Sequence, residues 1–287
     1  MRLGIVGMLP GDFRTFQPDQ MAAIRDLGFT GFGFHLNGDD VFAITEADCA
    51  AYRSFIAAEG LDLAQFAITY DECLFAVDPQ SRQRVSAKIG RGTEIAALLH
   101  AQSFLLRPGS LNPTRPWTPH RYSHLPEQVD RLVATLRPLA AKAEQEGVML
   151  AMETHVVSIM DPPEKCRRIV EAVGSEYLRL ILDVVNHFDS MQQVYNSGEF
   201  AQHILDELGP ISPIVHIKDL RVSDGLVLHI DQVLPGEGEL DLGFVLKRFD
   251  ALFADGYGLI EHLSLAQIPQ AVANVRRIAT EAGVKIH

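Results

Sequence analysis

The chain has 287 residues, and its 37 Asp and Glu against 25 Lys and Arg give a formal net charge of −12. Hydrophobic residues make up 47% and charged residues 22%, as in ordinary globular proteins, which argues against an intrinsically disordered chain. The acidic balance disfavours partners that are bound mainly through phosphate charge. We therefore expect neither nucleic acid nor a membrane surface as a partner.

Cysteine usage and the amino-terminal segment predict a cytoplasmic protein. Cys49, Cys73 and Cys166 form no CxxC pair, so we expect buried, reduced thiols rather than disulfides or a cysteine zinc site. The first residues, MRLGIVGMLPG, are typical of a strand, because their apolar run is too short for a signal peptide. No apolar run approaches the roughly 18 residues that a membrane-spanning helix needs.

A short apolar run followed by an amphipathic stretch recurs along the chain. Each run is rich in branched or aromatic residues and ends in a polar residue or a turn, which is typical of a buried parallel strand. One run occurs in about every 36 residues, the size of a βα unit. The predicted strands lie at 3–8, 31–36, 61–68, 103–109, 148–155, 178–187, 213–219 and 258–263.

The segments between these runs are predicted to be helices. In residues 126–146, apolar side chains recur at the spacing of a one-sided helix, with Pro126 at its start and Gly147 just past its end. Pro138 is expected to kink this helix. The glycines after the first strand do not form the GxGxxG of a Rossmann fold. We predict a single (β/α)8 TIM-barrel domain over residues 1–287, with its active site at the carboxyl-terminal ends of the strands.

Two long connections follow predicted strands and are expected to lie on the active-site face. Residues 107–126 are rich in proline and hold the only tryptophan, Trp117. Residues 219–241 end in the sequence PGEGELD. Connections of this length are more often functional lids than spacers, although the first could instead form a stiff subunit contact.

The last four predicted strands each end in an ionisable residue. Glu153, Asp183, His216 and Glu261 all follow apolar runs, where a lone charge would be costly to bury. A barrel brings these side chains together on one rim. Three carboxylates and one imidazole form a ligand set that suits Mn²⁺, our first choice, Mg²⁺ or Co²⁺, and that also admits Zn²⁺.

Each of these residues also has a purely structural interpretation. Asp183 could cap the following turn, and His216 could be a hydrogen-bonded core histidine. Glu153 or Glu261 could pair with a basic side chain at a strand end. Their occurrence at the same place in successive units favours the metal site over four separate structural roles.

The pattern Glu, Asp, His-x-Lys-Asp, Gly-Glu-Gly, Glu between Val148 and Leu263 resembles the xylose-isomerase-like TIM barrels. This superfamily includes ketose epimerases such as D-tagatose 3-epimerase, inosose dehydratase and endonuclease IV. The resemblance implies one divalent metal ion held by the four residues, with the two glutamates moving protons on opposite faces of a small carbohydrate-like substrate. It also implies a homo-oligomer, since barrels of this family are commonly dimers or tetramers.

Five further residues are expected to contact the substrate. The resemblance calls for a histidine three residues after Asp183, and here His187 comes four residues after it. Lys218 and Arg221 lie near the seventh strand. His155 comes two residues after Glu153, and Arg107 opens the proline-rich connection, so both belong to the same expected rim.

The reaction itself stays open at this stage. We favour a metal-dependent isomerase or epimerase of a small sugar, polyol or keto-acid, which acts through an enediolate. A lyase or dehydratase that eliminates water or an alcohol would use the same intermediate. An endonuclease-like phosphodiesterase ranks lower, because the spacing of His229 and Asp231 to the Gly236-Glu237-Gly238 turn differs from that family's metal pair. A barrel that only binds a small molecule is the remaining alternative.

Overall fold

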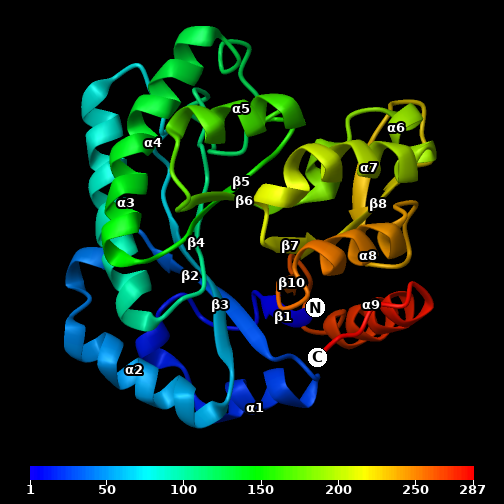
Figure 1. Ribbon diagram of the computed structural model, residues 1–287, viewed down its shortest axis with the longest axis horizontal. Coiled ribbons are helices and arrows are strands. Elements are labelled where there is room, and N and C mark those ends of the chain that lie inside the picture. Colours follow the sequence, from blue (N-terminus) through cyan, green and yellow to red (C-terminus); the bar gives the residue numbers. More distant parts are fainter.

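Eight parallel strands close into a barrel in the computed structural model, which describes residues 1–287 (Figure 1). The order around the barrel is β1-β10-β7-β6-β5-β4-β3-β2, so the last strand closes on the first. The predicted (β/α)8 architecture is therefore confirmed. The barrel strands are β1 Arg2–Val6, β2 Gly31–Asn37, β3 Asp62–Thr69, β4 Phe104–Leu106, β5 Leu150–Glu153, β6 Leu178–Leu182, β7 Ile214–Ile217 and β10 Tyr257–Ile260.

Helices surround the barrel and bury their apolar faces against the outside of the strands (Figure 1). No helix is both long enough and apolar enough to cross a lipid bilayer. The α-helices are α1 Pro18–Asp26, α2 Glu46–Glu59, α3 Pro79–Leu99, α4 Pro126–Glu146, α5 Pro163–Val173, α6 Met191–Tyr195, α7 Ser197–Leu208, α8 Leu242–Leu252 and α9 Ile268–Glu281. Short 3-10 helices are η1 Phe13–Thr15, η2 Asp40–Ala43, η3 Val184–His187 and η4 Gly209–Ile211.

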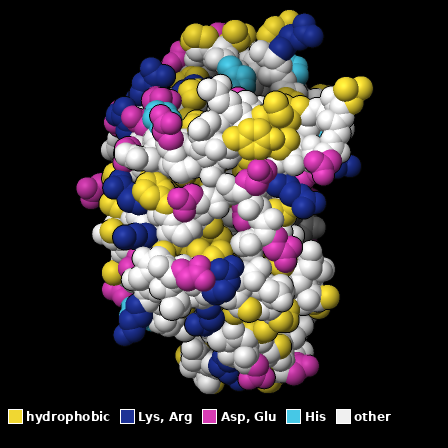
Figure 2. Space-filling model, turned by 90° about the vertical axis from the view of Figure 1, so that its right-hand side faces the viewer, with side chains coloured by type: hydrophobic (Ala, Val, Ile, Leu, Met, Phe, Trp, Pro, Cys, Tyr) yellow, Lys and Arg dark blue, Asp and Glu magenta, His cyan; other side chains and the backbone are white.

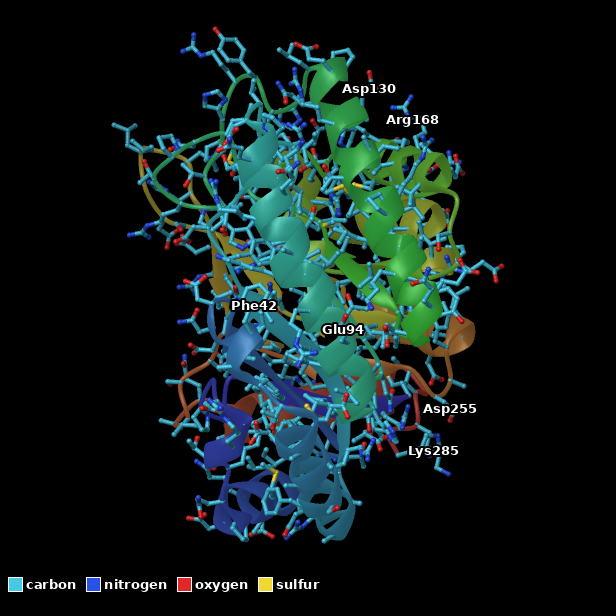
Figure 3. All side chains as sticks on the ribbon, turned by 90° about the vertical axis from the view of Figure 1, so that its left-hand side faces the viewer. Phe42, Glu94, Asp130, Arg168, Asp255 and Lys285 are labelled. Carbon is cyan, nitrogen blue, oxygen red and sulfur yellow. The ribbon has the colours of Figure 1, made fainter.

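The helix α4 has the bounds that its sequence predicts. Pro126 occupies the first turn, where a missing N–H costs nothing, and Pro138 lies inside the helix. Gly147 ends the helix with φ of 69°, a left-handed conformation that glycine adopts without a steric penalty, and its N–H donates to the Ala143 carbonyl. Figure 3 shows α4 beside α3, to which Lys142 Nζ is linked by an ion pair of 2.9 Å with Glu94.

Alternation along the strands decides which side chains enter the barrel. Residues such as Met152, Leu180 and Val215 face outward into the large core shared with the helices. Their neighbours on the other face form a small separate cluster inside the barrel. That cluster consists of Val6, Ala64, Ala67, Leu105, Ala151, Ile181, Ile214, Tyr257 and Leu259. The same alternation, continued by two residues, places Glu153, Asp183, His216 and Glu261 above this cluster, at the carboxyl end of the barrel.

The second long connection contains structure that the sequence analysis does not predict. Strands β8 Asp219–Val222 and β9 Ile230–Val233 form an antiparallel hairpin that stands apart from the barrel sheet (Figure 1). The tip of the hairpin is apolar, and Leu226 there is fully exposed. On the side of the molecule that carries α8 and α9, basic side chains lie singly or in small groups among acidic ones (Figure 2).

Candidate metal centre

Four buried side chains from neighbouring strand ends converge at the carboxyl end of the barrel. Glu153 is the last residue of β5, Asp183 follows β6, His216 lies in β7, and Glu261 follows β10. One potential ligand atom from each side chain lies within 4.8 Å of the other three. The sequence pattern therefore predicts this spatial cluster correctly.

Several atoms of the cluster have no hydrogen-bond partner although they are buried. They are Asp183 Oδ1, His216 Nδ1 and Glu261 Oε1, of which the last two lie 3.0 Å from each other and Glu261 Oε1 also lies 2.7 Å from Lys218 Nζ. Buried polar atoms are normally satisfied by hydrogen bonds, so these three atoms are candidate ligands for a cation. Carboxylate oxygens and an imidazole nitrogen are also the donors that Mg²⁺, Mn²⁺ and Zn²⁺ accept. The residues present thus fit a divalent metal ion.

A glutamine fixes the orientation of the histidine. His216 Nε2 lies 2.9 Å from Gln65 Oε1, an acceptor-only atom, so Nε2 carries the proton and donates it to Gln65. Nδ1 then faces the cluster, 3.0 Å from Glu261 Oε1 and 3.4 Å from Asp183 Oδ2, and it is the ring nitrogen that can offer a lone pair to a metal ion once it has lost its proton. A hydrogen bond that fixes the tautomer in this way is typical of metal-binding histidines.

A buried lysine completes the electrostatics of the cluster. Lys218 Nζ lies 2.5 Å from Asp183 Oδ2 and 2.7 Å from Glu261 Oε1. Burial disfavours the charged imidazolium of His216, but the Glu261 and Asp183 carboxylates outweigh burial and raise the pKa of His216 to about 10. These values describe the chain without a bound cation, which would compete with the proton for Nδ1.

The two glutamates differ sharply in their affinity for a proton. Burial raises the pKa of Glu153 to about 7, and the Lys218 ammonium only partly opposes this shift. Burial also disfavours the carboxylate of Glu261, but His216 and Lys218 outweigh it and hold the pKa of Glu261 well below its usual range. Two carboxyl groups of unequal pKa at one site are typical of acid–base pairs in enzymes.

Two of the expected substrate contacts line the barrel mouth. His155 follows β5, and the Trp117 ring of the proline-rich connection lies 5.5 Å from it, so this connection covers that side of the mouth. Burial lowers the pKa of His155 to about 4, which keeps the imidazole neutral. Arg107 follows β4, and its guanidinium lies 5.1 Å from the centre of the Tyr70 ring.

His187 lies beside the cluster, but both of its ring nitrogens already have protein partners. Nδ1 lies 2.9 Å from Asp161 Oδ1, and Nε2 lies 2.8 Å from Thr154 Oγ1. The preceding residue, Asn186, donates from Nδ2 to the Thr154 carbonyl at 3.1 Å and, more weakly, to Glu153 Oε1 at 3.5 Å. These contacts hold the end of β5 and therefore the orientation of Glu153.

The remaining predicted residues lie in the β8–β9 hairpin, outside the cluster. Arg221 is exposed in β8 and pairs in register with Asp231 of β9. His229 is exposed near the hairpin tip, and Asp231 accepts a hydrogen bond from the Ser223 hydroxyl. None of these residues joins the only group of metal-ligating side chains in the chain.

The Gly-Glu-Gly turn has a structural role that the sequence analysis does not identify. Buried Asp219 accepts hydrogen bonds from the backbone N–H groups of Gly236 and Gly238 at 2.9 Å each, and of Leu240 at 3.1 Å. These bonds offset the cost of burying the carboxylate. A Cβ on Gly238 would lie 2.1 Å from Asp219 Oδ1, so no larger residue fits there.

Three further residues of the mouth are absent from the sequence prediction. Gln65 is fully buried in β3, and an amide inside an apolar strand is the only signal that could have revealed it. His35 lies two residues before the end of β2, and His262 follows Glu261 directly. His262 has φ of 59°, a left-handed conformation that is uncommon for histidine, and its Nε2 lies 3.7 Å from Glu261 Oε1.

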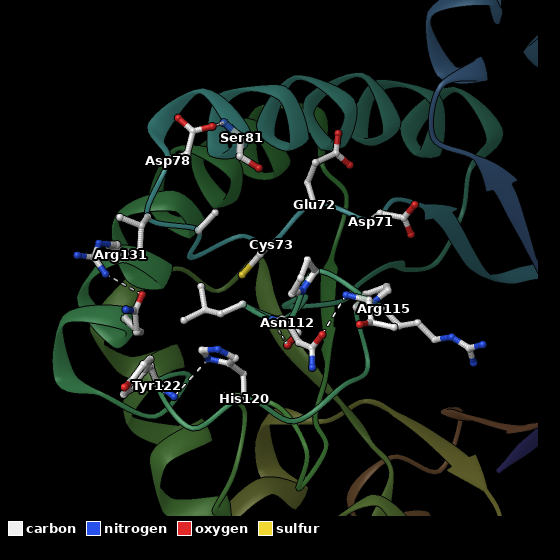
Figure 4. A pocket seen from close by; sticks show the side chains of 18 of the residues that line it. Asp71, Glu72, Cys73, Asp78, Ser81, Asn112, Arg115, His120, Tyr122 and Arg131 are labelled. Atoms are coloured by element: carbon white, nitrogen blue, oxygen red, sulfur yellow. Dashed lines mark hydrogen bonds between the residues drawn. The ribbon is translucent and has the colours of Figure 1, made fainter.

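A separate pocket of about 940 Å³ lies outside the barrel mouth, between the β3–α3 and β4–α4 connections (Figure 4). Its walls include Asp78, His120, Tyr122 and Arg131, and none of the four clustered side chains lines it. Burial raises the pKa of Cys73 in its wall to about 12, so this thiol is protonated and unreactive. The pocket is therefore not the candidate active site.

Comparison with known proteins agrees with this geometry. Residues 21–280 match the family described as xylose isomerase-like TIM barrel. The chain belongs to this family. A solved xylose isomerase-like TIM barrel protein from Mycobacterium smegmatis, in complex with magnesium, is similar in structure to this chain, with a TM-score of 0.72 and 16% sequence identity. The match covers 98% of this chain and 96% of that one. D-Psicose 3-epimerase from Clostridium cellulolyticum H10, solved with D-tagatose, has a TM-score of 0.72 at 13% identity, covering 99% and 100%.

A curated relative shares more sequence over a shorter stretch. Inosose dehydratase from Clostridium perfringens is 26% identical over 168 residues, which cover 54% of this chain and 53% of that protein. The chain thus spans about half the length of the curated relatives that it matches. Relatives in this family are sugar epimerases, isomerases and inosose dehydratase, so an enzymatic activity is expected of this chain.

Proposed function

We propose that this protein is a divalent-metal-dependent isomerase or epimerase of a small sugar, polyol or keto-acid. The observation that carries the proposal is the buried cluster in which two glutamates of unequal pKa share one candidate metal site. Proton transfer next to a carbonyl group needs this combination, because an acid, a base and a means of stabilising negative charge must act together.

Glu153, Asp183, His216 and Glu261 would hold the metal ion, with Mn²⁺ as our first choice. When bound, a divalent cation there would supply Lewis-acid stabilisation of the negative charge that develops on the substrate oxygens. Mg²⁺, Co²⁺ and Zn²⁺ satisfy the same donor set. Gln65 keeps the Nδ1 lone pair of His216 directed at this position.

The two glutamates are proposed to move the proton. Glu261 is held as a carboxylate, so it can accept the proton from the carbon next to the substrate carbonyl. Glu153, with a pKa of about 7, is partly protonated at neutral pH and can return a proton to the opposite face of the resulting enediolate. The reverse reaction exchanges these roles, which suits an epimerase.

Substrate contacts are proposed for the residues around this centre. Arg107 and His155 line the mouth, and Trp117 covers one side of it. His187 is buried with both ring nitrogens engaged, so its proposed role is to position the Thr154 segment rather than to contact the substrate directly. For Arg221, a substrate contact would require the hairpin to reach across the mouth.

A second candidate is a lyase or dehydratase that expels water or an alcohol from a keto-sugar or inosose. The sequence similarity to inosose dehydratase favours it. Elimination would use one glutamate as the base and the other as the acid that protonates the departing oxygen. An endonuclease-like activity is not proposed, because His229 and Asp231 lie outside the cluster and no second ligand group exists.

Product analysis on a substrate panel tests the proposal. Metal-stripped protein would be incubated with ketoses, inososes, 3-keto-glycosides and keto-acids, with and without added Mn²⁺, and the products would be identified by mass spectrometry and NMR. We expect an isomer of unchanged mass, formed only with metal. A product lighter by water or an alcohol would instead establish the lyase. Metal-independent turnover would contradict both candidates.

A further inference from the structure

Lys218 occupies an unusual place for a charged side chain. It follows β7, two residues after His216, and only 2% of its side chain is exposed. Its ammonium lies 2.5 Å from Asp183 Oδ2 and 2.7 Å from Glu261 Oε1, carboxylate oxygens of two of the four residues that form the candidate metal site. A buried lysine of this kind needs a countercharge, and here the proposed metal ligands provide it.

The ammonium and a metal ion would compete for the carboxylates of Asp183 and Glu261. His216 Nδ1 lies 3.0 Å from the Glu261 oxygen and 3.4 Å from the Asp183 oxygen that Lys218 contacts. Both oxygens therefore face a single point, which one cation can occupy at a time. The other oxygen of Asp183, Oδ1, is buried and has no hydrogen-bond partner.

The summed charge of the clustered side chains and Lys218 indicates the charge of the metal ion that would neutralise the site. Glu153, Asp183 and Glu261 contribute three negative charges when ionised, and Lys218 contributes one positive charge. The remainder is two negative charges, which a divalent ion neutralises. Without Lys218 the buried cluster would keep one uncompensated negative charge even with the metal bound.

We propose that Lys218 is the internal counter-cation of the metal centre, a role that rests on the proposed metal site. In the metal-free chain its ammonium holds Asp183 and Glu261 together. When a divalent ion binds, the ammonium withdraws from these oxygens, and this competition makes the metal affinity weaker than the four ligands alone would give. Lys218 is thus a positioning residue that sets metal affinity, in addition to any contact with substrate.

This role and a merely structural role predict opposite effects of removing the charge. If Lys218 only positions the ligands, its loss misplaces them and metal binds more weakly. If Lys218 competes with the metal, its loss removes the competing ammonium from Asp183 and Glu261, and metal binds more tightly. The metal-free protein should at the same time become less stable, because the like charges repel one another.

Titration of the protein with Mn²⁺ alone distinguishes the counter-cation role from the structural role. The free Mn²⁺ is measured by electron paramagnetic resonance at each step. The proteins would be metal-stripped wild type, Lys218→Met, Lys218→Gln and the control Lys247→Met, which removes the same charge from the exposed face of α8. We expect Mn²⁺ to bind Lys218→Met and Lys218→Gln at least about tenfold more tightly than wild type, and Lys247→Met unchanged.

A melting curve of each metal-free protein provides the second readout. We expect Lys218→Met to melt below wild type without metal and to recover when Mn²⁺ is added. Equal or weaker Mn²⁺ affinity in both Lys218 variants, with wild type binding normally, would overturn the counter-cation role alone. Absence of Mn²⁺ binding in every protein would overturn the proposed metal site as well. Should Lys218→Met not fold without metal, Lys218→Gln decides the question, because its amide can still donate to Asp183.

Discussion

At the scale of single residues, the environment gives chemically identical side chains different properties. Glu153 and Glu261 are both buried, but only Glu261 faces His216 at 3.0 Å and Lys218 at 2.7 Å. Burial therefore dominates at Glu153 and raises its pKa to about 7, whereas opposite charges dominate at Glu261. The proposed division between acid and base follows from this difference in neighbours.

Replacing either glutamate by glutamine tests that division. Glutamine keeps the shape but neither accepts nor returns a proton, so we expect Glu153→Gln and Glu261→Gln each to lower kcat by at least about 100-fold. The matched control Glu237→Gln, in the exposed part of the Gly-Glu-Gly turn, should keep wild-type turnover. Full turnover by either cluster variant on the true substrate would refute its role in proton transfer.

Gln65 is expected to act on the metal through His216. Gln65→Met removes the acceptor at 2.9 Å from Nε2 while keeping the side-chain volume, so the imidazole loses its fixed tautomer. We expect Mn²⁺ affinity to fall about 10- to 100-fold. Gln128→Met, at another buried glutamine far along the chain in α4, should leave the affinity unchanged. An unaltered affinity in Gln65→Met would show that Gln65 does not orient the ligand.

His35 is expected to make stability depend on pH. The surrounding groups of the barrel mouth desolvate the imidazole and lower its pKa to about 4, but the residue is exposed, so solvent screening reduces the effect of this shift on stability. In the unfolded chain a histidine titrates near 6.5, so between about 6.5 and 4 the unfolded state binds more protons. Stability from neutral His35 is thus complete above about pH 6.5 and is lost as pH falls towards 4. In metal-free protein, His35→Gln should lose less stability than wild type between pH 7 and 4.5, and an identical loss would contradict this account.

At the scale of elements, the loop after β7 depends on one buried carboxylate. Asp219 receives the N–H groups of Gly236, Gly238 and Leu240, and these bonds fix the chain between the β8–β9 hairpin and α8. Gly238 packs so closely that an added Cβ would lie 2.4 Å from the Leu220 carbonyl oxygen. Packing therefore requires a glycine at position 238.

Substitution of Gly238 measures this constraint. We expect Gly238→Ala to lower the free energy of unfolding by about 1–3 kcal/mol, because the methyl group forces the backbone apart. Gly90→Ala is the control, since an added Cβ in the interior of α3 meets no atom within 4 Å and alanine favours a helix. Urea unfolding of both variants gives the comparison. Equal stability of Gly238→Ala and wild type would show that the loop relaxes at little cost.

Elements and the cluster could be predicted from sequence to different extents. The strand ends at Glu153, Asp183, His216 and Glu261 are local signals, because each charge directly follows an apolar run, and barrel symmetry brings them together. The β8–β9 hairpin could not be predicted, since its short strands lack a regular alternation and its fixed point, Asp219, acts through residues about 20 positions away.

The roles of some site residues could not be predicted from the local sequence either, because their contacts join segments that lie far apart along the chain. Gln65 meets His216 only when the closed barrel brings β3 opposite β7. The engagement of both nitrogens of His187 depends on Asp161 and Thr154 from another connection. The contact of Lys218 with Asp183 also joins two strands, so sequence spacing alone suggested a substrate contact.

At the scale of the whole molecule, three buried carboxylates in one cluster couple metal binding to folding. Without a metal ion, only Lys218 and His216 compensate the charge of the three carboxylates. Repulsion among the carboxylates therefore makes the metal-free folded state less stable than the metal-bound state. A ligand that binds only the folded state stabilises it in proportion to the logarithm of its concentration over Kd.

Removal of the metal should therefore lower the melting temperature. At a free Mn²⁺ concentration of about 100 times Kd, the gain is about 2.7 kcal/mol, or roughly 4–5 °C for a domain of this size. We expect one cooperative transition with and without metal, as for a single domain, and a return to the lower value after chelation. Two separate transitions, or no shift on adding Mn²⁺, would contradict the view of one domain folded around one metal site.

Wash-in of solvent deuterium is the measurement that tests the central claim most directly. Each candidate carbonyl substrate would be incubated in D₂O with Mn²⁺-loaded wild type, with metal-stripped wild type and with Glu153→Gln or Glu261→Gln, and the proton signal next to the carbonyl would be followed by NMR. For a substrate whose proton faces Glu261, the account predicts that this signal disappears with metal-loaded wild type and persists with metal-stripped wild type and with Glu261→Gln, which lacks the base. Glu153→Gln keeps that base, so it should exchange the signal without forming the isomer. A signal lost equally without metal or without Glu261 would contradict proton transfer at this cluster.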